Sequence, residues 1–229
     1  MALALLVCTR PAAAERCPVP AGAAEALAEQ SATQRWHQIE RAVTAEARSA
    51  RHWLLGWGIA HGALLGGSLA LIPLDDRSAR PDHVVGAAAS AVGLVATQLG
   101  RHGALAATRE LEGLPADGCA AVASAEATLA RLADDDRLST AWFVHVANVG
   151  FNVGMGLILG LGYDRWGPAA LQMAGGSAIG ELLIDTRPTA EDALARYRAG
   201  ELDQAPKARL VPLLFATPTG WMLGARASF

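Results

Sequence analysis

The chain has 229 residues, of which 52% are hydrophobic and only 18% are charged, with a formal net charge of −3 at pH 7. Soluble domains usually carry about a quarter charged residues, so this balance favours a membrane protein. Aromatic residues make up only 5% and glycine contributes 24 residues, which suits helices that pack closely in lipid. The small negative charge and the lack of a basic run argue against a nucleic-acid partner.

The first residues resemble an export signal. A short apolar run, Ala2 to Val7, precedes three alanines, and the small residues Ala12 and Ala14 suit cleavage before Glu15. The positively charged start of such a signal is missing, and an uncleaved N-terminal tail is the alternative. We predict a signal peptide over residues 1–14 and an exported mature chain.

Three cysteines are present, and Cys8 would be removed with the signal. Cys17 and Cys119 would then remain as one pair, which in an exported protein usually forms a disulfide. Two free or buried thiols are the alternative. No C-x-x-C spacing occurs, which excludes a zinc ribbon and a thioredoxin-type site.

Four apolar stretches are each about as long as a membrane-spanning helix, which needs about 20 residues. They are Trp53–Leu74, His83–Gly100, Ala141–Gly162 and Trp166–Ile184. Aromatic residues that favour the headgroup region lie at their ends, namely Trp53, Trp57, Trp142, Tyr163 and Trp166. We predict an all-α membrane protein with four transmembrane helices arranged as two hairpins; the alternative is a soluble, alanine-rich bundle.

A cleaved signal places the mature N-terminus outside, so the first span enters from the exterior. The two short turns, 75–82 and 163–165, are then cytoplasmic, and both contain Arg, as the positive-inside rule favours. Segment 101–140 is then exterior, which puts Cys119 on the same side as Cys17. We predict a multi-pass bacterial inner-membrane protein with periplasmic termini. Its expected parts are 1–14 signal peptide, 15–52 exterior helical segment, 53–102 transmembrane hairpin 1, 103–140 exterior helical loop, 141–184 transmembrane hairpin 2, and 185–229 exterior helix and β-hairpin tail.

The two hairpins share a sequence pattern. In each, a Trp opens the first helix, an Asp-Arg turn follows, and a Ser-Ala-x-Gly stretch lies in the second helix. The pattern predicts a tandem repeat with pseudo-two-fold symmetry, and chance similarity between Ala- and Gly-rich helices is the alternative. Small-xxx-small pairs predict close helix contacts. These pairs are Gly62 and Gly66, Gly150 and Gly154, Gly156 and Gly160, and Gly176 and Gly180.

The remaining segments have signals of their own. Apolar residues at helical spacing predict helices over Ala24–Arg51 and Ser124–Leu132. Thr189 followed by Asp192 predicts a capping box for a helix that stops at Gly200. In the tail, residues 210–215 and 221–227 flank a Pro-Thr-Gly turn, which predicts a small β-hairpin or an extended flap at the exterior interface.

Six polar residues fall in the outer half of the predicted spans: His61, Gln98, His145, Asn148, Asn152 and Glu181. The spacing of three and four places the three on the third span on one helix face. Ionisable residues inside a span are costly and indicate a functional site. Glu181 with His61 or His145 would bind a cation or relay a proton, and two His with one carboxylate suit a transition metal. The alternative is hydrogen bonding between helices, which we expect of the two asparagines.

Catalytic motifs are missing: no G-x-S-x-G, H-E-x-x-H or G-x-x-x-x-G-K-[ST] occurs. Ser90 and Ser177 lie among small residues without an evident base. We therefore assign no catalytic residue and no cofactor. We hypothesise a non-enzymatic envelope interaction or scaffold protein, whose partners are the lipid bilayer and another envelope protein or a second copy of this chain. The alternative is a small transporter or an ion- or proton-binding protein that uses the outer-leaflet His/Glu cluster.

Several stretches together carry a resemblance to a known group. They are the signal-like start, the Trp-rich entry to the first span, the turn Gly162–Arg165, the stretch from Glu181 to Thr189, and the tail that ends in Phe229. In these features the chain resembles an uncharacterised family of bacterial four-span envelope proteins. The resemblance implies the architecture and no particular activity.

Overall fold

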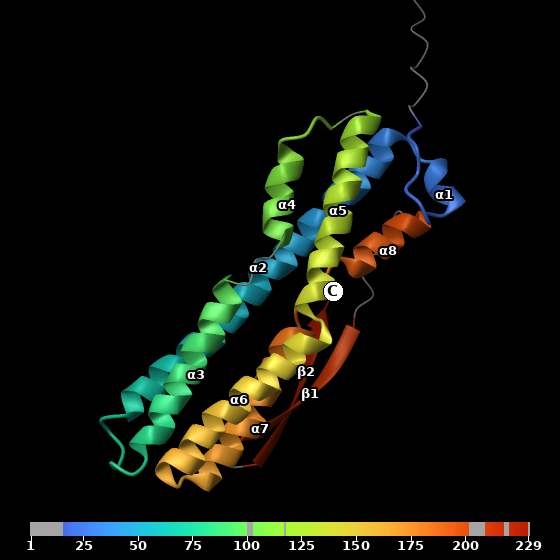
Figure 1. Cartoon of the computed structure of the whole chain (residues 1–229). Coiled ribbons are helices and arrows are strands. Elements are labelled where there is room, and N and C mark those ends of the chain that lie inside the picture. The colour runs from blue at the N-terminus through green and yellow to red at the C-terminus, as the bar shows by residue number, and fades with distance from the viewer. Residues whose placement is uncertain (1–15, 100–102, 117, 202–208, 218–219, 229) are drawn as a thin grey trace, which may run out of the picture.

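The computed structural model describes residues 16–99, 103–116, 118–201, 209–217 and 220–228. The predicted signal peptide over 1–14 and Cys8 lie outside these residues. The described part of the chain is mostly helical (Figure 1). Its helices are α1 (Glu25–Ala28), α2 (Ala32–Leu71), α3 (Arg80–Leu99), α4 (Gly103–Glu112), α5 (Cys119–Ser139), α6 (Trp142–Tyr163), α7 (Trp166–Asp185) and α8 (Glu191–Ala199). Two strands follow, β1 (Arg209–Thr217) and β2 (Gly220–Ser228). They pair antiparallel, with Arg209 opposite Ser228 and Thr217 opposite Gly220.

Two regions divide the helical part of the molecule (Figure 1). We name residues 16–52, 103–139 and 186–201 the head, which contains α1, the first half of α2, α4, α5 and α8. We name residues 53–99 and 140–185 the bundle, which contains the second half of α2, α3, α6 and α7. In the bundle, α2 packs on α3 and α6 packs on α7, so the helices form the two hairpins that the sequence predicts.

The helix α2 connects the two regions without interruption. It has 40 residues and is therefore about 60 Å long. Its first turn is fixed by a capping box, in which the Ser31 hydroxyl accepts from the Gln34 amide and the Gln34 side chain accepts from the Ser31 amide. The predicted start of this helix at Ala24 is wrong, because α1 ends at Ala28 and Ser31 begins a new helix.

The head has an apolar core of the kind found in soluble domains. Leu27, Trp36, Ile39 and Val43, which recur at helical spacing in the sequence, are all buried there. They meet α4, α5 and α8 through the buried residues Ala104, Ala107, Leu111, Ala121, Val122, Ala125, Leu129, Leu132, Ala133, Ala190 and Tyr197. The helix α5 is much longer than the predicted Ser124–Leu132, and sequence patterns gave no bounds for α4.

The bundle turns its apolar side chains outward. Three helical stretches are long and apolar enough to cross a membrane, namely Ala32–Leu71, Arg80–Glu112 and Cys119–Tyr163, the last two counted across short links. In the most apolar 18-residue window of the first, only 6% of the residues are buried inside the protein. The helix α7 is not among the three, since Gln172 and Glu181 lower its mean hydropathy. The composition and the structure thus agree on a helical membrane protein.

The short helix α8 begins differently from the prediction. Its N-cap is Ala190, whose side chain cannot accept a hydrogen bond, so the capping box of Thr189 and Asp192 is wrong. The cap comes from α5 instead, where the Asp136 carboxylate accepts from the Ala190 amide at 2.8 Å. The predicted stop is confirmed, because Gly200 adopts the left-handed conformation with φ of 75°.

Only half of the predicted small-residue pairs mark close contacts. A Cβ added at Gly156 would lie 2.8 Å from the Ala169 carbonyl oxygen, and one at Gly160 would lie 2.7 Å from the Trp166 ring. The pair on α7, Gly176 and Gly180, likewise faces α6 closely. The remaining four glycines have open space beside them, namely Gly62, Gly66, Gly150 and Gly154. The small-xxx-small spacing therefore predicts more close helix contacts than the structure contains.

Candidate functional site

A chain of hydrogen bonds joins α6 to α7 through most of the predicted polar residues. At the end of this chain nearer the head, His145 forms an ion pair with Glu181. The Asn148 side chain donates to the other Glu181 oxygen at 2.8 Å and to the Ser177 carbonyl at 3.0 Å. His145 and Asn148, which the sequence predicts on one face of α6, therefore both contact Glu181 of α7.

The chain of hydrogen bonds continues deeper into the bundle. Asn152 donates to the Asn148 side-chain oxygen at 3.0 Å, and Gln172 donates to the Asn152 side-chain oxygen at 3.3 Å. Gly180 lies against the Asn148 amide, and Gly176 lies against the Asn152 amide. A Cβ added at either glycine would collide with the asparagine that faces it. The glycines of α7 therefore make room for the asparagines of α6. The two asparagines bond between and within helices as predicted, and Gln172 is a member that the sequence did not single out.

The other two predicted members lie on the first hairpin. The His61 ring rests against Gly93 of α3, where an added Cβ would lie 2.7 Å from Nδ1. Gln98 lies beside Gly58 of α2, with its side-chain nitrogen 3.0 Å from an added Cβ. Each large side chain thus fills the notch left by a glycine on the neighbouring helix. Among the described residues, no hydrogen bond joins His61 or Gln98 to the chain between α6 and α7.

A metal centre of two histidines and one carboxylate is not formed in this conformation. Among the residues described, no group of three or more His, Cys, Asp or Glu side chains is placed to hold a metal ion. The reason is that His61 lies on α2 against α3, whereas His145 and Glu181 pair between α6 and α7. The suggestion of a three-ligand metal site at this cluster is therefore wrong for this arrangement.

A cavity of about 530 Å³ lies between the two hairpins. His61, Ser90, Asn148, Asn152 and Gln172 line it together with apolar residues and glycines from α2, α3, α6 and α7. Three of the six predicted polar residues, His61 on one hairpin and Asn148 and Asn152 on the other, therefore line the same cavity. Their sequence positions could not reveal the cavity, because its size depends on how the hairpins pack.

At the turn end of the bundle, an ion pair holds the two hairpins together. Arg165, in the turn between α6 and α7, donates to both carboxylate oxygens of Asp82 at the start of α3. This two-point geometry is the strong form of an Arg–carboxylate contact. A second polar contact lies within the first hairpin, where His83 Nε2 is 2.7 Å from a carboxylate oxygen of Asp75. In the sequence, Arg165 indicated only the direction of the spans, and its contact with Asp82 was not predicted.

At the opposite end, two tryptophans attach α2 to the end of α7. The indole N–H groups of Trp53 and Trp57 both point to the Thr186 hydroxyl, at 3.2 and 3.1 Å. Trp53 is buried. Of the five aromatic residues predicted at the interface, Trp142, Tyr163 and Trp166 are exposed and fit that role. Trp53 and Trp57 instead tie the bundle to the head.

Three charged residues gather where the head meets the bundle, and the sequence analysis missed them. Burial raises the pKa of Glu46 to about 7, and the charge of Asp136 adds to this effect. Burial also raises the pKa of Asp136, although the Ala190 amide opposes it. Burial lowers the pKa of Arg187, and Asp136 partly offsets this. The three groups come from α2, α5 and the link before α8, which no sequence pattern connects.

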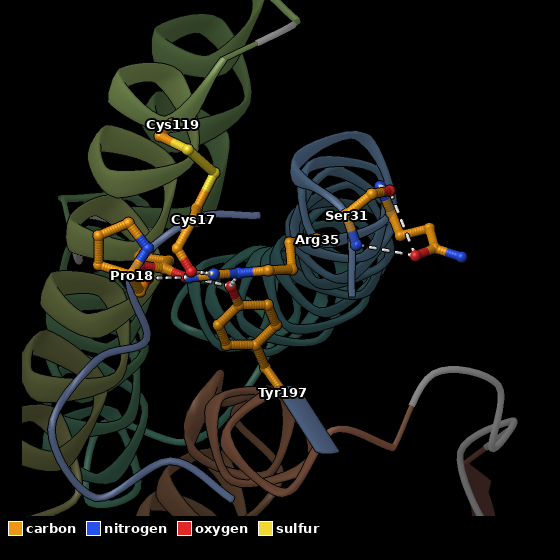
Figure 2. Close-up of a disulfide and its surroundings, with 8 residues drawn as sticks. Cys17, Pro18, Ser31, Arg35, Cys119 and Tyr197 are labelled. Atoms are coloured by element: carbon orange, nitrogen blue, oxygen red, sulfur yellow. Dashed lines mark hydrogen bonds and ion pairs between the residues drawn. A yellow bond between two sulfur atoms is a disulfide. The ribbon is translucent and has the colours of Figure 1, made fainter. Parts of the chain in front are cut away.

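The predicted disulfide between Cys17 and Cys119 is confirmed, across a sequence separation of 102 residues (Figure 2). Beside it the fully buried Arg35 donates to the Cys17 and Pro18 carbonyl oxygens, each at 2.9 Å. Its Nε donates to the Tyr197 hydroxyl at 3.0 Å.

Glu126 completes this arrangement by bonding both Arg35 and Tyr197. Burial lowers the pKa of Arg35, but its bonds to Glu126 and Tyr197 outweigh that and raise it overall. Burial and Glu126 raise the pKa of Tyr197. A buried charge with every partner in place holds α2, α5, α8 and the N-terminal segment in one arrangement.

Comparison with known proteins identifies no relative. No protein-family model matches the chain, and no curated protein or solved structure matches it either. Function therefore has to be inferred from the geometry of the residues themselves.

Proposed function

We propose that the chain is a four-span protein of the bacterial inner membrane that acts as a non-enzymatic scaffold and holds its head on the exterior side. Three observations support this proposal: how the hairpins return to the head, where the disulfide lies, and how rigidly the head is joined to the first span.

The number of spans is supported by the connections of the head. α4 follows α3, α5 precedes α6, and α8 follows α7, and all three pack in the same head core. Each hairpin therefore leaves the head and returns to it. If α6 crosses the bilayer, α7 must cross back, although its own hydropathy is lower. Its 20 residues give a length of about 30 Å, which matches the hydrocarbon core.

The orientation is supported by the disulfide. Structural disulfides persist in oxidising compartments such as the periplasm, and the Cys17–Cys119 disulfide lies in the head. Arg77, Arg80 and Arg165 lie at the opposite end, in or beside the two turns, but the head carries more Arg near the spans, including Arg48, Arg51 and Arg137. The orientation therefore rests on the disulfide rather than on the positive-inside rule.

A scaffold role is supported chiefly by the continuous α2. The same helix carries Trp36, Ile39 and Val43 of the head core and continues into the bundle. The head therefore cannot swing on a flexible linker. Such rigid coupling to the membrane suits a protein that presents a fixed surface to another envelope component.

Photocrosslinking in intact cells tests this role. A photoreactive amino acid is placed at exposed head positions, Arg48 and Ser124, and at the lipid-facing position Leu161 as a control. We expect protein-sized adducts of one fixed mass from the head and none from Leu161. The Glu181→Gln change should leave the adducts unchanged. Head positions that yield no discrete adduct would contradict a scaffold role.

A second function, ion or proton binding, is favoured by one observation. The His145–Glu181 pair lies at the outer end of the polar chain, and Asn148 and Asn152 of that chain line the cavity. Proteoliposomes that contain a pH-sensitive dye test it. Proton entry that Glu181→Gln abolishes, while the exposed-site control Glu112→Gln retains it, would favour this function over the scaffold.

A further inference from the structure

The cavity between the two hairpins opens sideways, inside the region that we assign to the membrane. Its volume of about 530 Å³ falls within the range of sites that hold small organic molecules. Leu64 of α2 and Leu171 of α7 line it, yet they are also 47% and 75% exposed. These two side chains therefore form a rim that faces lipid, and we name the space the lateral groove.

The lining of the lateral groove is mainly apolar. The amides of Asn148, Asn152 and Gln172 bond to one another in a chain. The His61 ring packs with its nitrogens enclosed against Gly93, so it offers them to no occupant. Because an ordered water needs two to four polar partners, this lining favours hydrocarbon over water.

The lateral groove is long and follows the helices. Its lining extends from Asp82 to Ala96 on α3 and from Pro168 to Leu183 on α7, which is about 20 Å on each helix. One lipid chain spans half of the hydrocarbon core, or about 15 Å. The lateral groove is therefore long enough to hold a whole extended lipid chain.

The exposed rim lies near the turn end of the bundle. Leu64 is seven residues before the end of α2, and Leu171 is five residues after the start of α7, so both lie within about 10 Å of that end. This depth is inside one leaflet. Toward the head, Trp53 and Trp57 bridge α2 to Thr186 at the end of α7, which closes the gap between these helices. A lipid chain would therefore enter from the leaflet at the turn end.

The charges at the turn end select no particular headgroup. Residues 72–82 and 163–165 contain four Asp and three Arg, so this end has almost no net charge. Asp82, which borders the lateral groove, is paired with Arg165. The fit of the hydrocarbon chain, rather than the charge of the headgroup, therefore determines what is held.

We infer that the lateral groove binds one acyl chain of a phospholipid from the leaflet at the turn end, which is the cytoplasmic leaflet in the proposed orientation. The acyl chain fills the space between the hairpins, and the headgroup stays at the interface beside the turns. The site goes beyond the scaffold role and depends only on the bundle lying in lipid.

Native mass spectrometry of the full-length protein tests the inference. The protein is transferred from nanodiscs of phosphatidylethanolamine or of phosphatidylglycerol into a neutral detergent. We expect one retained phospholipid per protein from either lipid, because the lateral groove shields the acyl chain from the detergent. Retention of none, or of phosphatidylglycerol alone, would overturn the inference. So would a retained molecule other than a phospholipid in protein purified from cells.

Two leucine substitutions, one of them a matched control, locate the site. Gly175→Leu adds a side chain to the lining at a position where an added Cβ meets nothing within 4 Å, so the variant should fold and retain no phospholipid. Gly154→Leu on α6 is equally unobstructed but lies outside the lining, and should retain one. Loss of the phospholipid in both variants, or in neither, would contradict the assignment.

Photolabelling in nanodiscs separates an acyl chain in the lateral groove from the lipid around the protein. The probe is phosphatidylcholine with a diazirine in the middle of one acyl chain. Ser90 lines the lateral groove and is only 8% exposed, so label on Ser90 requires an acyl chain inside. We expect label there in the unmodified protein and none in Gly175→Leu, whereas the exposed Leu161 should be labelled equally in both. Label on Leu161 without label on Ser90 would overturn the inference.

Discussion

The head and the bundle place apolar side chains in opposite ways. Leu129 in the head is 0% exposed, whereas Leu161 in the bundle is 72% exposed. The head buries its apolar residues against each other, as a soluble domain does. The bundle turns them outward, because lipid tails replace water as the surroundings. One chain is therefore folded for two solvents, water around the head and lipid around the bundle, and α2 runs through both regions.

Polar groups follow the same division. The buried charge of the head, Arg35, has carbonyl, hydroxyl and carboxylate partners. In the bundle five polar residues bond in a chain, namely His145, Glu181, Asn148, Asn152 and Gln172, and His61 has no hydrogen-bond partner among the described residues. The head thus pairs its buried charge, although the side-chain oxygens of Gln30 and Gln38 there have no partner among the described residues.

The largest expected effect comes from removing the disulfide with Cys17→Ser and Cys119→Ser. A closed loop of about 100 residues predicts a loss of about 4 to 5 kcal/mol in head stability. Hydrogen exchange should rise in peptides of α5 and α8 and stay unchanged in α6 and α7. Equal increases in head and bundle would break the distinction between the two regions.

Next comes Arg35→Met, which leaves Glu126 and the Tyr197 hydroxyl buried without their cation. Breaking a buried ion pair costs about 3 to 5 kcal/mol. Urea unfolding of the purified protein measures the change. The control Arg48→Met, at an exposed position of the same helix, should stay within about 0.5 kcal/mol. Similar losses in the two variants would show that Arg35 does not hold the head together.

Shortening one leucine in the head and one in the bundle tests whether the two regions place apolar side chains in opposite ways. Leu129→Ala removes a fully buried side chain in the head and should cost about 2 to 4 kcal/mol. Leu161→Ala shortens a side chain that faces lipid, and lipid fills the space, so the cost should be below about 0.5 kcal/mol. The melting temperature in nanodiscs measures both. A large loss with Leu161→Ala would mean that this face packs against protein.

The smallest effect is a pH dependence at the junction of the two regions. The pKa of Glu46 is raised from 4.5 to about 7 in the folded protein, so the folded state binds a proton more tightly than the unfolded state. The stabilising contribution is complete below pH 4.5, declines as the pH rises to 7, and is absent above it. At pH 8 Glu46→Gln should therefore be more stable than the unmodified chain, by about 2 kcal/mol.

The pH dependence of the Glu46→Gln variant is the control. Across pH 5 to 7 the unmodified chain should lose stability relative to the variant. A parallel pH profile for the two proteins would show that Glu46 is not buried at the junction.

The sequence predicted the parts that depend on local pattern or composition. The bounds of α3, α6 and α7 follow from apolar length, the disulfide follows from cysteine counting, and the α6 face follows from the spacing of His145, Asn148 and Asn152. It failed where distant residues decide. The Asp136 carboxylate caps α8, although it lies 54 residues before Ala190 in the sequence. Gly93 on α3 makes room for the ring of His61 on α2. The capping box at Ser31 and Gln34 was readable in the sequence and was overlooked.

The most direct test of the account is the accessibility of cysteines in intact cells to an impermeant maleimide. The native pair, Cys17 and Cys119, reports on the head, and Ser78→Cys, introduced together with Cys8→Ser, reports on the exposed turn between α2 and α3. We predict that Cys17 and Cys119 react only after reduction, and that the turn cysteine reacts only after the membrane is permeabilised. A turn cysteine that reacts in intact cells, with head cysteines that do not react after reduction, would contradict both the orientation and the exterior head.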